Sequence, residues 1–391
     1  MRLSCQFEEL LSNLVSSSVV VDDALVSEDM RNIIFDLSKD KGFRLISTSK
    51  LITHKLTIPE DSYTMDLGDA EEFRFQLKSK TIINYLNAYK TLRRTYVDEV
   101  IFEDVNNKIK CTIIEKDKTE DDDFGFETDE EKTYVSSWIF TQVPIKPSIL
   151  GYLTKEAPTD VEMTDVNSDY IKVYTSSMLP LMQNVTSMFG KLAFTEKYVI
   201  AFSSAYTAML VNALPINGVL LSYKAVSFLD KVICNSPIVS IAKSGTDLFC
   251  RTDTSETFIM YESKLPNYEP YVAMNKREHC VVIDRIYLKD VLKRFSLVDE
   301  NIACDIKANA GVVTMKNTSY SQELEIISST AMESFEQLSF KILPAVFDKA
   351  IIGDDNACCP ELSIYYNSEA GCLILSDEQG QWFTVVRVKI S

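Results

Sequence analysis

Hydrophobic and polar residues alternate along most of this chain, which predicts a fold made mainly of short strands. Ile238, Ser240 and Ala242 show the pattern of an antiparallel strand that packs on one face and meets water on the other. The segments read as strands are 31–37, 43–48, 97–102, 108–114, 197–203, 238–242, 257–261, 311–316, 323–328, 362–366, 372–375 and 382–390. Antiparallel sheet is therefore expected to dominate the fold.

A smaller set of segments has helical spacing instead. Phe7, Leu10, Leu11 and Leu14 fall at i, i+3, i+4 and i+7, which places them on one face of a helix. The predicted helices cover residues 7–15, 78–94, 177–189, 224–233, 284–297 and 343–352. Asp284 is the expected N-cap of the fifth helix.

The order of these elements predicts an internal repeat. Helix pairs begin near residues 6, 177 and 284, with several strands between the two partners of each pair. We therefore expect an α+β protein of three similar domains, at residues 1–150, 171–270 and 271–391. The first domain carries an acidic insert at 115–132. The polar, aperiodic segment 151–170 is the predicted linker.

The distribution of charge along the chain says more about possible partners than the net charge does. The chain has 391 residues and a net charge of −17, whereas most nucleic-acid-binding proteins are basic. Its Asp and Glu residues crowd the insert 115–132 and the segment 160–169, while Lys and Arg gather on the predicted helices. These basic residues form either one functional surface or merely the solvated faces of amphipathic helices.

The sequence offers little for catalysis. His54 and His279 are the two histidines, and neither lies near Cys or a carboxylate at metal-ligand spacing. No phosphate-binding loop, dinucleotide fingerprint, HExxH or GxSxG motif occurs. Asp121–Asp123 belong to the acidic run, which favours a solvated loop over a metal site. We expect no enzyme activity, no cofactor and no metal.

The cysteine pattern and the apolar segments bear on the compartment. Nine cysteines without CxxC spacing suit reduced thiols, and no run approaches the ~20 apolar residues of a membrane helix. The N-terminus also lacks the pattern of a secretory signal. A cytoplasmic protein with no membrane contact is expected.

Two stretches resemble bacterial β sliding clamps, the ring-shaped processivity factors of DNA polymerases. In the first, Leu265-Pro266-Asn267-Tyr268 is similar to the family's turn before the third domain, and Arg294 to Val298 lie on the helix that follows. The second is the C-terminus, TVVRVKIS, which resembles the family's hydrophobic tail. The segments 75–92 and 218–232 are similar to the strand and second helix of domains one and two. Only Phe202 to Ala205 represent a short motif of domain two, which indicates a divergent member, plausibly from a bacteriophage.

The resemblance implies a homodimeric ring around double-stranded DNA, with antiparallel sheets outside and two helices per domain lining the bore. DNA would be held topologically and without sequence preference, through phosphate contacts rather than base contacts. The residues expected to face DNA are Lys78, Lys80, Lys90, Arg93, Arg94, Lys224, Lys231, Arg285, Lys289, Lys293, Lys341 and Lys349.

The resemblance also implies a hydrophobic pocket that binds short peptide motifs of DNA polymerase and the clamp loader. Its expected residues are Ser203, Ala205, Ala208, Met209, Pro266, Pro270, Tyr271, Val385, Val386, Arg387 and Val388. Arg387 stands where the family commonly has proline, and Pro270 where it has a basic residue. A last strand that only packs its own core is the alternative for 385–388.

Ring closure by similarity would use apolar contact from Leu297 and Val298, and an acidic strip at Glu323 and Glu325. Arg74, Lys78 or Lys80 would face that strip. Two other functions stay open at this point: a clamp-fold adapter for transcription or recombination proteins, and an unrelated β-rich structural protein.

Overall fold

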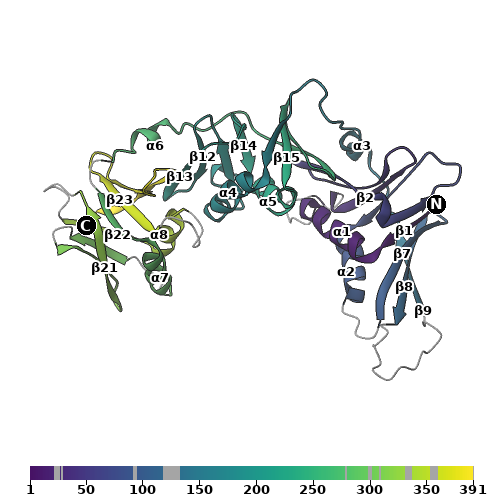
Figure 1. The fold of residues 1–391 in the computed structure, drawn as a ribbon, viewed down its shortest axis with the longest axis horizontal. Coiled ribbons are helices and arrows are strands. Elements are labelled where there is room, and N and C mark those ends of the chain that lie inside the picture. Colours follow the sequence, from purple (N-terminus) through teal and green to yellow (C-terminus); the bar gives the residue numbers. More distant parts are fainter. Residues whose placement is uncertain are drawn as a thin grey trace. The chain divides into compact units, whose positions relative to one another are not determined.

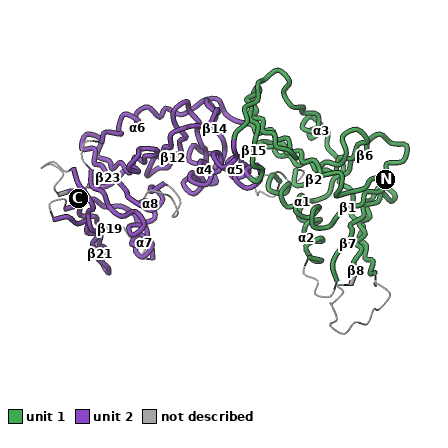
Figure 2. The backbone as a smooth tube through the Cα atoms, viewed as in Figure 1, with its two compact units in different colours: residues 1–166, 235–260 green, residues 167–234, 261–391 purple. Residues whose placement is uncertain are grey.

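The structure is a computed structural model that describes residues 1–21, 27, 30–90, 95–117, 133–277, 280–297, 302–307, 310–330, 337–352 and 360–390. The chain forms two compact units (Figure 2). Unit 1 comprises residues 1–166 and 235–260, and unit 2 comprises residues 167–234 and 261–391.

Unit 1 contains two antiparallel sheets. The first has the order β5 (Tyr63–Asp66), β1 (Arg2–Gln6), β7 (Thr95–Val105), β8 (Lys108–Asp117) and β9 (Thr133–Thr141). The second has the order β10 (Thr164–Asn167), β15 (Ile238–Ser244), β16 (Asp247–Arg251), β17 (Ser255–Met260), β4 (Ile52–Thr57), β3 (Gly42–Thr48), β2 (Asn32–Ser38) and β6 (Glu72–Lys78). Pairing of β17 with β4 joins segments far apart in the sequence.

Aromatic side chains fill the core between these two sheets. Phe35 on β2 stacks on Phe75 on β6, with ring centroids 4.5 Å apart, and lies 5.2 Å from Phe102 on β7 of the other sheet. Helix α1 (Phe7–Val21) contacts strands of both sheets and buries Phe7, so the helix closes the same core.

Unit 2 contains one continuous antiparallel sheet. Its order is β14 (Val219–Ser222), β11 (Lys191–Phe194), β12 (Tyr198–Phe202), β13 (Tyr206–Val211), β25 (Trp382–Arg387), β24 (Cys372–Ser376), β23 (Glu361–Asn367), β18 (Cys280–Asp284), β21 (Ser321–Ser329), β20 (Val312–Lys316), β19 (Ile302–Lys307), β22 (Gln337–Ile342) and β26 (Lys389–Ile390). The pairing of β13 with β25 places the C-terminal segment beside strands from the middle of the chain.

The main helices pack in the three predicted pairs (Figure 1). In unit 1, α1 packs against α2 (Ser79–Lys90), and unit 2 holds the pairs α4 (Ser168–Met178) with α5 (Tyr223–Lys231) and α7 (Arg285–Phe295) with α8 (Pro344–Ala350). Two shorter helices are α3 (Pro147–Leu153) and α6 (Glu269–Ala273). The short 3-10 turns are η2 (Glu60–Ser62), η3 (Leu179–Leu181), η4 (Met188–Gly190) and η5 (Ile233–Asn235). The predicted α+β class is confirmed.

The predicted helix ends were right for α7 and wrong for α4. The Asp284 carboxylate accepts a hydrogen bond from the Tyr287 backbone N–H at 2.8 Å, which makes it the predicted N-cap. Helix α4 begins at Ser168, capped by Asn167, about nine residues before the predicted start. Pro180 lies in the 3-10 turn that follows the helix.

The segment predicted as a linker contains regular secondary structure. The range 151–170 contains the end of α3, strand β10 and the start of α4. Ile149 and Leu153 of α3 pack on Ile34 and Ile46 of the eight-stranded sheet. Each of these elements buries only a few side chains, so the segment has a low hydropathy. The sequence analysis therefore did not detect them. Among the described residues, no helix is long and apolar enough to cross a membrane.

Candidate functional site

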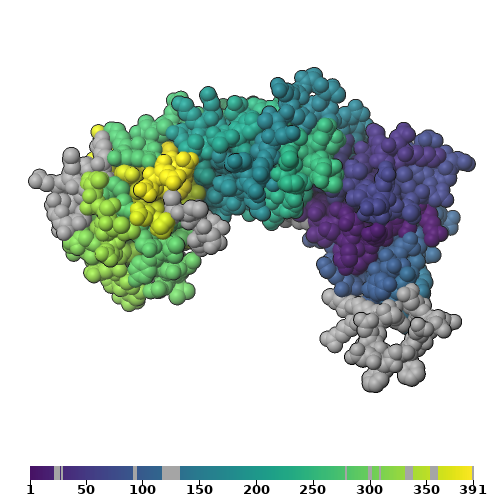
Figure 3. All heavy atoms as spheres, in the orientation of Figure 1, coloured from purple at the N-terminus to yellow at the C-terminus, as the bar shows by residue number. Residues whose placement is uncertain are grey.

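A pocket of about 290 Å³ opens in unit 2 next to the end of β25. Four segments form its wall: β13, α6 with the residues after it, the turn between β23 and β24, and β25. The lining residues are Tyr206, Thr207, Tyr271, Met274, Ala370, Gly371, Cys372, Val385 and Arg387. Figure 3 shows C-terminal residues, in yellow, at the surface of unit 2.

Backbone pairing and one turn hold these segments together. Val385 pairs with Thr207 on one side and with Ile374 on the other, and the Arg387 N–H donates to the Ala205 carbonyl at 2.9 Å. The Asn367 side chain donates to the Met274 carbonyl at 2.9 Å and accepts from the Ala370 N–H at 3.0 Å. One asparagine therefore ties the segment after α6 to the β23–β24 turn.

The floor of the pocket is apolar and well buried. Tyr206, Cys372 and Val385 are each less than 10% exposed, and the Tyr271 ring meets Phe202 edge-on with 6.2 Å between centroids. Burial raises the pKa of the Cys372 thiol above its ordinary value, so the sulfur stays protonated and is a poor nucleophile at neutral pH. The chemistry of the pocket is that of apolar binding.

Arg387 is the single charged side chain among the lining residues of this pocket. It is exposed, and within the part of the chain that the structure describes its guanidinium has no ion pair and no hydrogen bond. The nearby carboxylate of Glu369 is paired with Lys276 at 2.5 Å. The pocket thus combines an apolar floor with one uncompensated positive charge.

The structure brings together part of the predicted pocket. Tyr271, Val385 and Arg387 line it, Ala205 supports Arg387 through its carbonyl, and Met209 lies in the core cluster that Val385 shares. The remaining predicted residues do not line this pocket: Ala208 and Val386 are fully buried, and Ser203, Pro266, Pro270 and Val388 lie outside the lining.

Most of the pocket residues were missed by the sequence reading. Tyr206, Thr207, Met274 and the turn Ala370–Cys372 line the pocket but were not predicted. A glycine at position 371 was the sequence feature that could have predicted a turn here. In the structure Gly371 adopts φ +60°, a conformation that favours glycine, at the turn between two strands. A Cβ built on Gly371 would meet no atom within 4 Å, in keeping with open space beside it.

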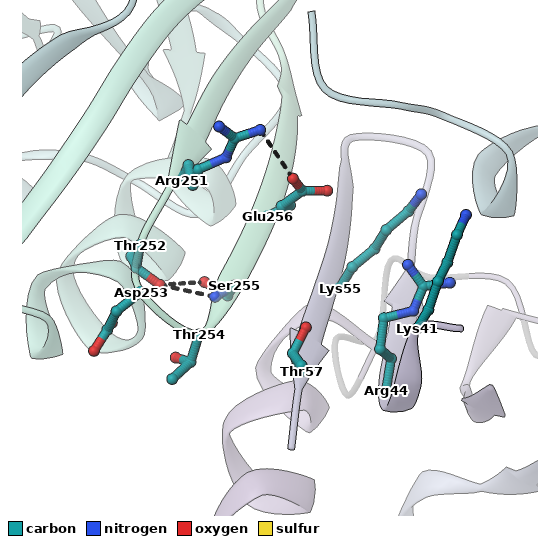
Figure 4. Close-up of a pocket in the computed structure, with 10 residues that line it drawn as sticks. All are labelled: Lys41, Arg44, Lys55, Thr57, Arg251, Thr252, Asp253, Thr254, Ser255 and Glu256. Carbon is teal, nitrogen blue, oxygen red and sulfur yellow. Dashed lines mark hydrogen bonds and ion pairs between the residues drawn. The ribbon is translucent and has the colours of Figure 1, made fainter. Parts of the chain in front are cut away.

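A second pocket, of about 320 Å³, lies in unit 1 and is lined by polar residues (Figure 4). Three of its four cations are bound by this chain's own groups. Arg44 forms an ion pair with the buried carboxylate of Asp36, and Arg251 pairs with Glu256 at 3.1 Å. Lys55 donates to the carbonyls of Leu153, at 2.8 Å, and Lys155.

Electrostatics in this second pocket agree with a structural role. Burial and the neighbouring Arg44 lower the pKa of Lys55 to about 8, so the amine is still mainly protonated at neutral pH. Its two carbonyl partners lie at and just beyond the end of α3, where the backbone carbonyls lack helical partners. The lysine therefore caps α3 and fixes it over the sheet.

The basic residues predicted to face DNA have mixed surroundings. Lys80 and Lys90 on α2, Lys231 on α5, Lys293 on α7 and Lys349 on α8 are exposed. Lys224 and Lys289 are half-buried, while Lys78 and Lys341 are exposed on strands β6 and β22 rather than on helices. Arg93 and Arg94 lie outside the described residues.

Arg285 corrects the expectation for α7. It was predicted to face DNA together with Lys289 and Lys293, but it is only 3% exposed. Spacing explains the error, because Arg285 lies three and seven positions before the buried Leu288 and Leu292. Its charge is thus withdrawn from solvent.

The residues predicted for ring closure are also divided. Leu297 is 87% exposed, and Glu323 and Glu325 are exposed on β21. Arg74 is instead committed within unit 1, since its guanidinium contacts Asp36 at 2.6 Å and Glu72 at 2.8 Å. Val298 lies outside the described residues.

Edge strand β9 carries an apolar surface that the sequence reading missed. Tyr134, Val135, Trp138 and Ile139 are all exposed on this strand, which ends the five-stranded sheet. No other described strand pairs with the outer side of β9, and an edge of this kind is a template for pairing with another strand. The aromatic and β-branched residues of this segment favour strands, and they could have predicted it from the sequence.

Comparison with known proteins identifies the fold. No protein-family model matches the sequence, and no curated protein matches it. Solved structures do match along the whole chain. The beta subunit of DNA polymerase from Streptococcus pyogenes has 12% identity, covers 100% of both chains and gives a TM-score of 0.75. DNA polymerase III subunit beta from Borrelia burgdorferi, in complex with a natural product, has 11% identity, covers 99% of both chains and gives 0.76.

A sliding clamp (DNA polymerase III subunit beta) from Pseudomonas aeruginosa, bound to griselimycin, has 13% identity, covers 99% of both chains and gives a TM-score of 0.73. The chain therefore has the fold of bacterial DNA polymerase III beta subunits, as the sequence resemblance predicted. In the described residues, no group of three or more His, Cys, Asp or Glu side chains is arranged to hold a metal ion.

Proposed function

We propose that this chain is a non-catalytic DNA polymerase sliding clamp that encircles duplex DNA in the cytoplasm. The observation that carries the proposal is the fold likeness to bacterial beta subunits over 99% or more of the chain. A likeness of this extent includes all three helix pairs and all three sheets, so the complete architecture is retained at very low sequence identity.

DNA contact is assigned to the exposed lysines of the helices. Lys80 and Lys90 of α2 are exposed and, among the described residues, form no ion pair. Long-range attraction between such cations and phosphates follows the duplex without fixing a register, because it reads no bases. A clamp requires this combination, since direct base contacts would stop it from sliding.

Ring closure is assigned to two sheet edges from two copies of the chain. Strand β9 ends its sheet with exposed apolar side chains. On β21, residues 321–325 pair with β20, whereas β18 pairs only from Ile326 onward, which leaves one side of that stretch without a described strand. Three domains per chain, at 1–150, 171–270 and 271–391, would give a six-domain ring from two copies.

The pocket of unit 2 is the proposed docking site for DNA polymerase and the clamp loader. Its buried floor suits an apolar side chain, and its residues come from strands and a tied turn rather than from a free loop. Mostly apolar pockets with a few polar groups are typical ligand-binding sites. Docking would need no catalytic group.

Solution mass and DNA retention test the proposal. Light scattering over a concentration series should give a stable particle of about twice the 44.3 kDa chain. Once loaded, that dimer should remain on nicked circular DNA and leave after the circle is linearised. Equal loss from circular and linear DNA would contradict a topological clamp.

One observation favours a second function, a clamp-fold adapter for transcription or recombination proteins. The exposed side of α1 has Glu8 and Glu9 but no Lys or Arg, so one of the proposed bore helices lacks attraction for DNA. A persistent monomer that still binds partner peptides would favour the adapter over the clamp.

A further inference from the structure

We infer that the peptide docked in the unit 2 pocket carries an acidic side chain beside its apolar anchor, and that Arg387 selects for it. The inference rests on the proposed docking function of this pocket. It adds the chemistry of the partner: an apolar group for the floor and a carboxylate for the mouth.

Arg387 lies close to the floor of the pocket. It lies at the last residue of β25, two residues after Val385, which forms part of the floor. Its backbone N–H donates to the Ala205 carbonyl, so the main chain is fixed while the side chain is exposed. A ligand side chain on the floor therefore places its neighbouring residue within the reach of this guanidinium.

The charge of Arg387 is available to a ligand. Arg387 has no intramolecular partner in the described chain, whereas Lys276 and Glu369 next to the pocket neutralise each other. An arginine fork binds a carboxylate through two parallel N–H···O bonds, and partial removal of water by the apolar wall strengthens that contact. A lysine in the same ligand position would be repelled.

Other arginines that line or adjoin a pocket differ from Arg387. Arg44, Arg74 and Arg251 in unit 1 each have an acidic partner within the chain. Arg387 has no such partner among the residues that the structure describes. An acidic residue of the docked peptide supplies the missing partner.

Fluorescence anisotropy with designed peptides tests this inference. The probes are labelled hexapeptides with Leu and Phe anchors and one variable residue, Asp, Asn or Lys, scanned before, between and after the anchors. The proteins are the wild-type chain, Arg387→Gln and Arg387→Glu. Lys389→Gln is the matched control, because it removes one positive charge from the next strand but does not line the pocket.

Wild-type protein should bind the best Asp probe about three- to fivefold more tightly than its Asn counterpart at low salt, with a smaller ratio at high salt. Arg387→Gln should remove the preference while it retains binding of the Asn probe. Arg387→Glu should reverse the preference towards Lys, and Lys389→Gln should leave the wild-type ratio unchanged.

The outcomes separate this inference from the docking proposal. Equal binding of Asp, Asn and Lys probes to the wild-type chain would overturn the selectivity but leave docking intact. If Arg387→Gln still preferred the Asp probe, the preference would come from another residue. That result would overturn the role of Arg387 and leave docking intact. Absence of binding for every probe would overturn docking and the inference together.

Discussion

The two pockets have similar volumes, about 320 Å³ in unit 1 and about 290 Å³ in unit 2, but opposite chemistry. Four cations line the unit 1 pocket, and three of them have partners within the chain: Asp36 for Arg44, Glu256 for Arg251 and two carbonyls for Lys55. One cation, Arg387, lines the unit 2 pocket, and it has no partner among the described residues. We therefore take a charged side chain in a pocket as a candidate for ligand binding when it lacks a partner within the described chain. The number of charges around it is a poorer guide.

The paired charges of unit 1 contribute to stability, whereas the unpaired charge of the unit 2 pocket is available for binding. In unit 1 the charges lie opposite one another on neighbouring strands: Asp36 pairs with Arg44 on β3 and with Arg74 on β6. Removal of one member leaves the others buried or half-buried without compensation. We therefore expect substitutions in the unit 1 pocket to cost stability, and those in the unit 2 pocket to cost affinity.

The largest expected effect comes from Asp36→Asn. Asp36 is 1% exposed and its carboxylate is shared by Arg44 and Arg74. Loss of its charge should lower the free energy of unfolding by about 3 kcal/mol, because two guanidinium groups lose their common counter-ion. Urea unfolding followed by circular dichroism measures this change.

Glu71→Gln is the control for Asp36→Asn. It breaks the exposed pair of Lys39 with Glu71 in the same unit, at 3.4 Å. An exposed pair should contribute less than about 1 kcal/mol. Equal small losses for both variants would show that the shared carboxylate is not a structural centre.

The second prediction concerns acid. His54 on β4 is fully buried and bonds the Thr257 hydroxyl at 2.8 Å across the β4–β17 pairing. Burial lowers its pKa from 6.5 to about 4. Above pH 6.5 the ring is neutral in both the folded and the unfolded chain, so its contribution to stability is constant. Between pH 6.5 and 4 only the unfolded chain takes up the proton, and stability should fall by about 3 kcal/mol.

His54→Gln isolates that contribution from the carboxylates that also titrate in acid. The variant should lose less stability than the wild type between pH 7 and pH 4.5, whatever its stability at pH 7. Hydrogen exchange, corrected for intrinsic rates, should show the wild-type loss of protection in β4 and β17. An identical pH dependence in the two proteins would rule out His54 as the titrating group.

In unit 2, Tyr271→Ala should change affinity rather than stability. Tyr271 lines the pocket and is only half-buried, so its ring has surface left to cover a ligand. Truncation should weaken the designed peptides by about five- to thirtyfold, the range for an aromatic anchor residue of an interface. Anisotropy titrations measure it, and Tyr170→Ala on α4, an exposed tyrosine outside the pocket, is the control.

A large stability loss in Tyr271→Ala with unchanged peptide affinity would invert the comparison. The unit 2 pocket would then be part of the core, and the alternative that residues 385–388 form only a last packed strand would be favoured. Urea unfolding of the same samples separates the two outcomes.

The sequence predicted periodic elements well and spatial sites poorly. Helix α7 was found because its apolar spacing and its Asp284 cap are local properties. Strand β13 was missed because five of its six residues are buried, so no alternation marks it. Helix α4 was misplaced because a polar exposed side dominates its composition.

The pocket could be anticipated only through the family resemblance. Thr207, Met274 and Cys372 lie far apart in the chain, and strand pairing brings them together. Local pattern carries no information about that pairing. The same limit applies to Arg387, since only the folded chain shows that it has no ion pair among the described residues.

The smallest expected effect applies the missing-partner rule to DNA binding. Lys80 and Lys90 on α2 are exposed and without ion pairs among the described residues, so each should displace about one counter-ion from DNA. The double variant Lys80→Gln/Lys90→Gln should reduce the slope of log K against log salt by about 2.

The control is the double variant Lys39→Gln/Lys41→Gln. It removes the same charge from the β2–β3 turn in the same unit, where Lys39 is already paired with Glu71. Filter binding to duplex DNA across a salt series compares the two double variants. Equal slopes would mean that total charge, rather than unpaired charge on the helices, governs DNA binding, and the rule drawn from the pockets would not extend beyond them.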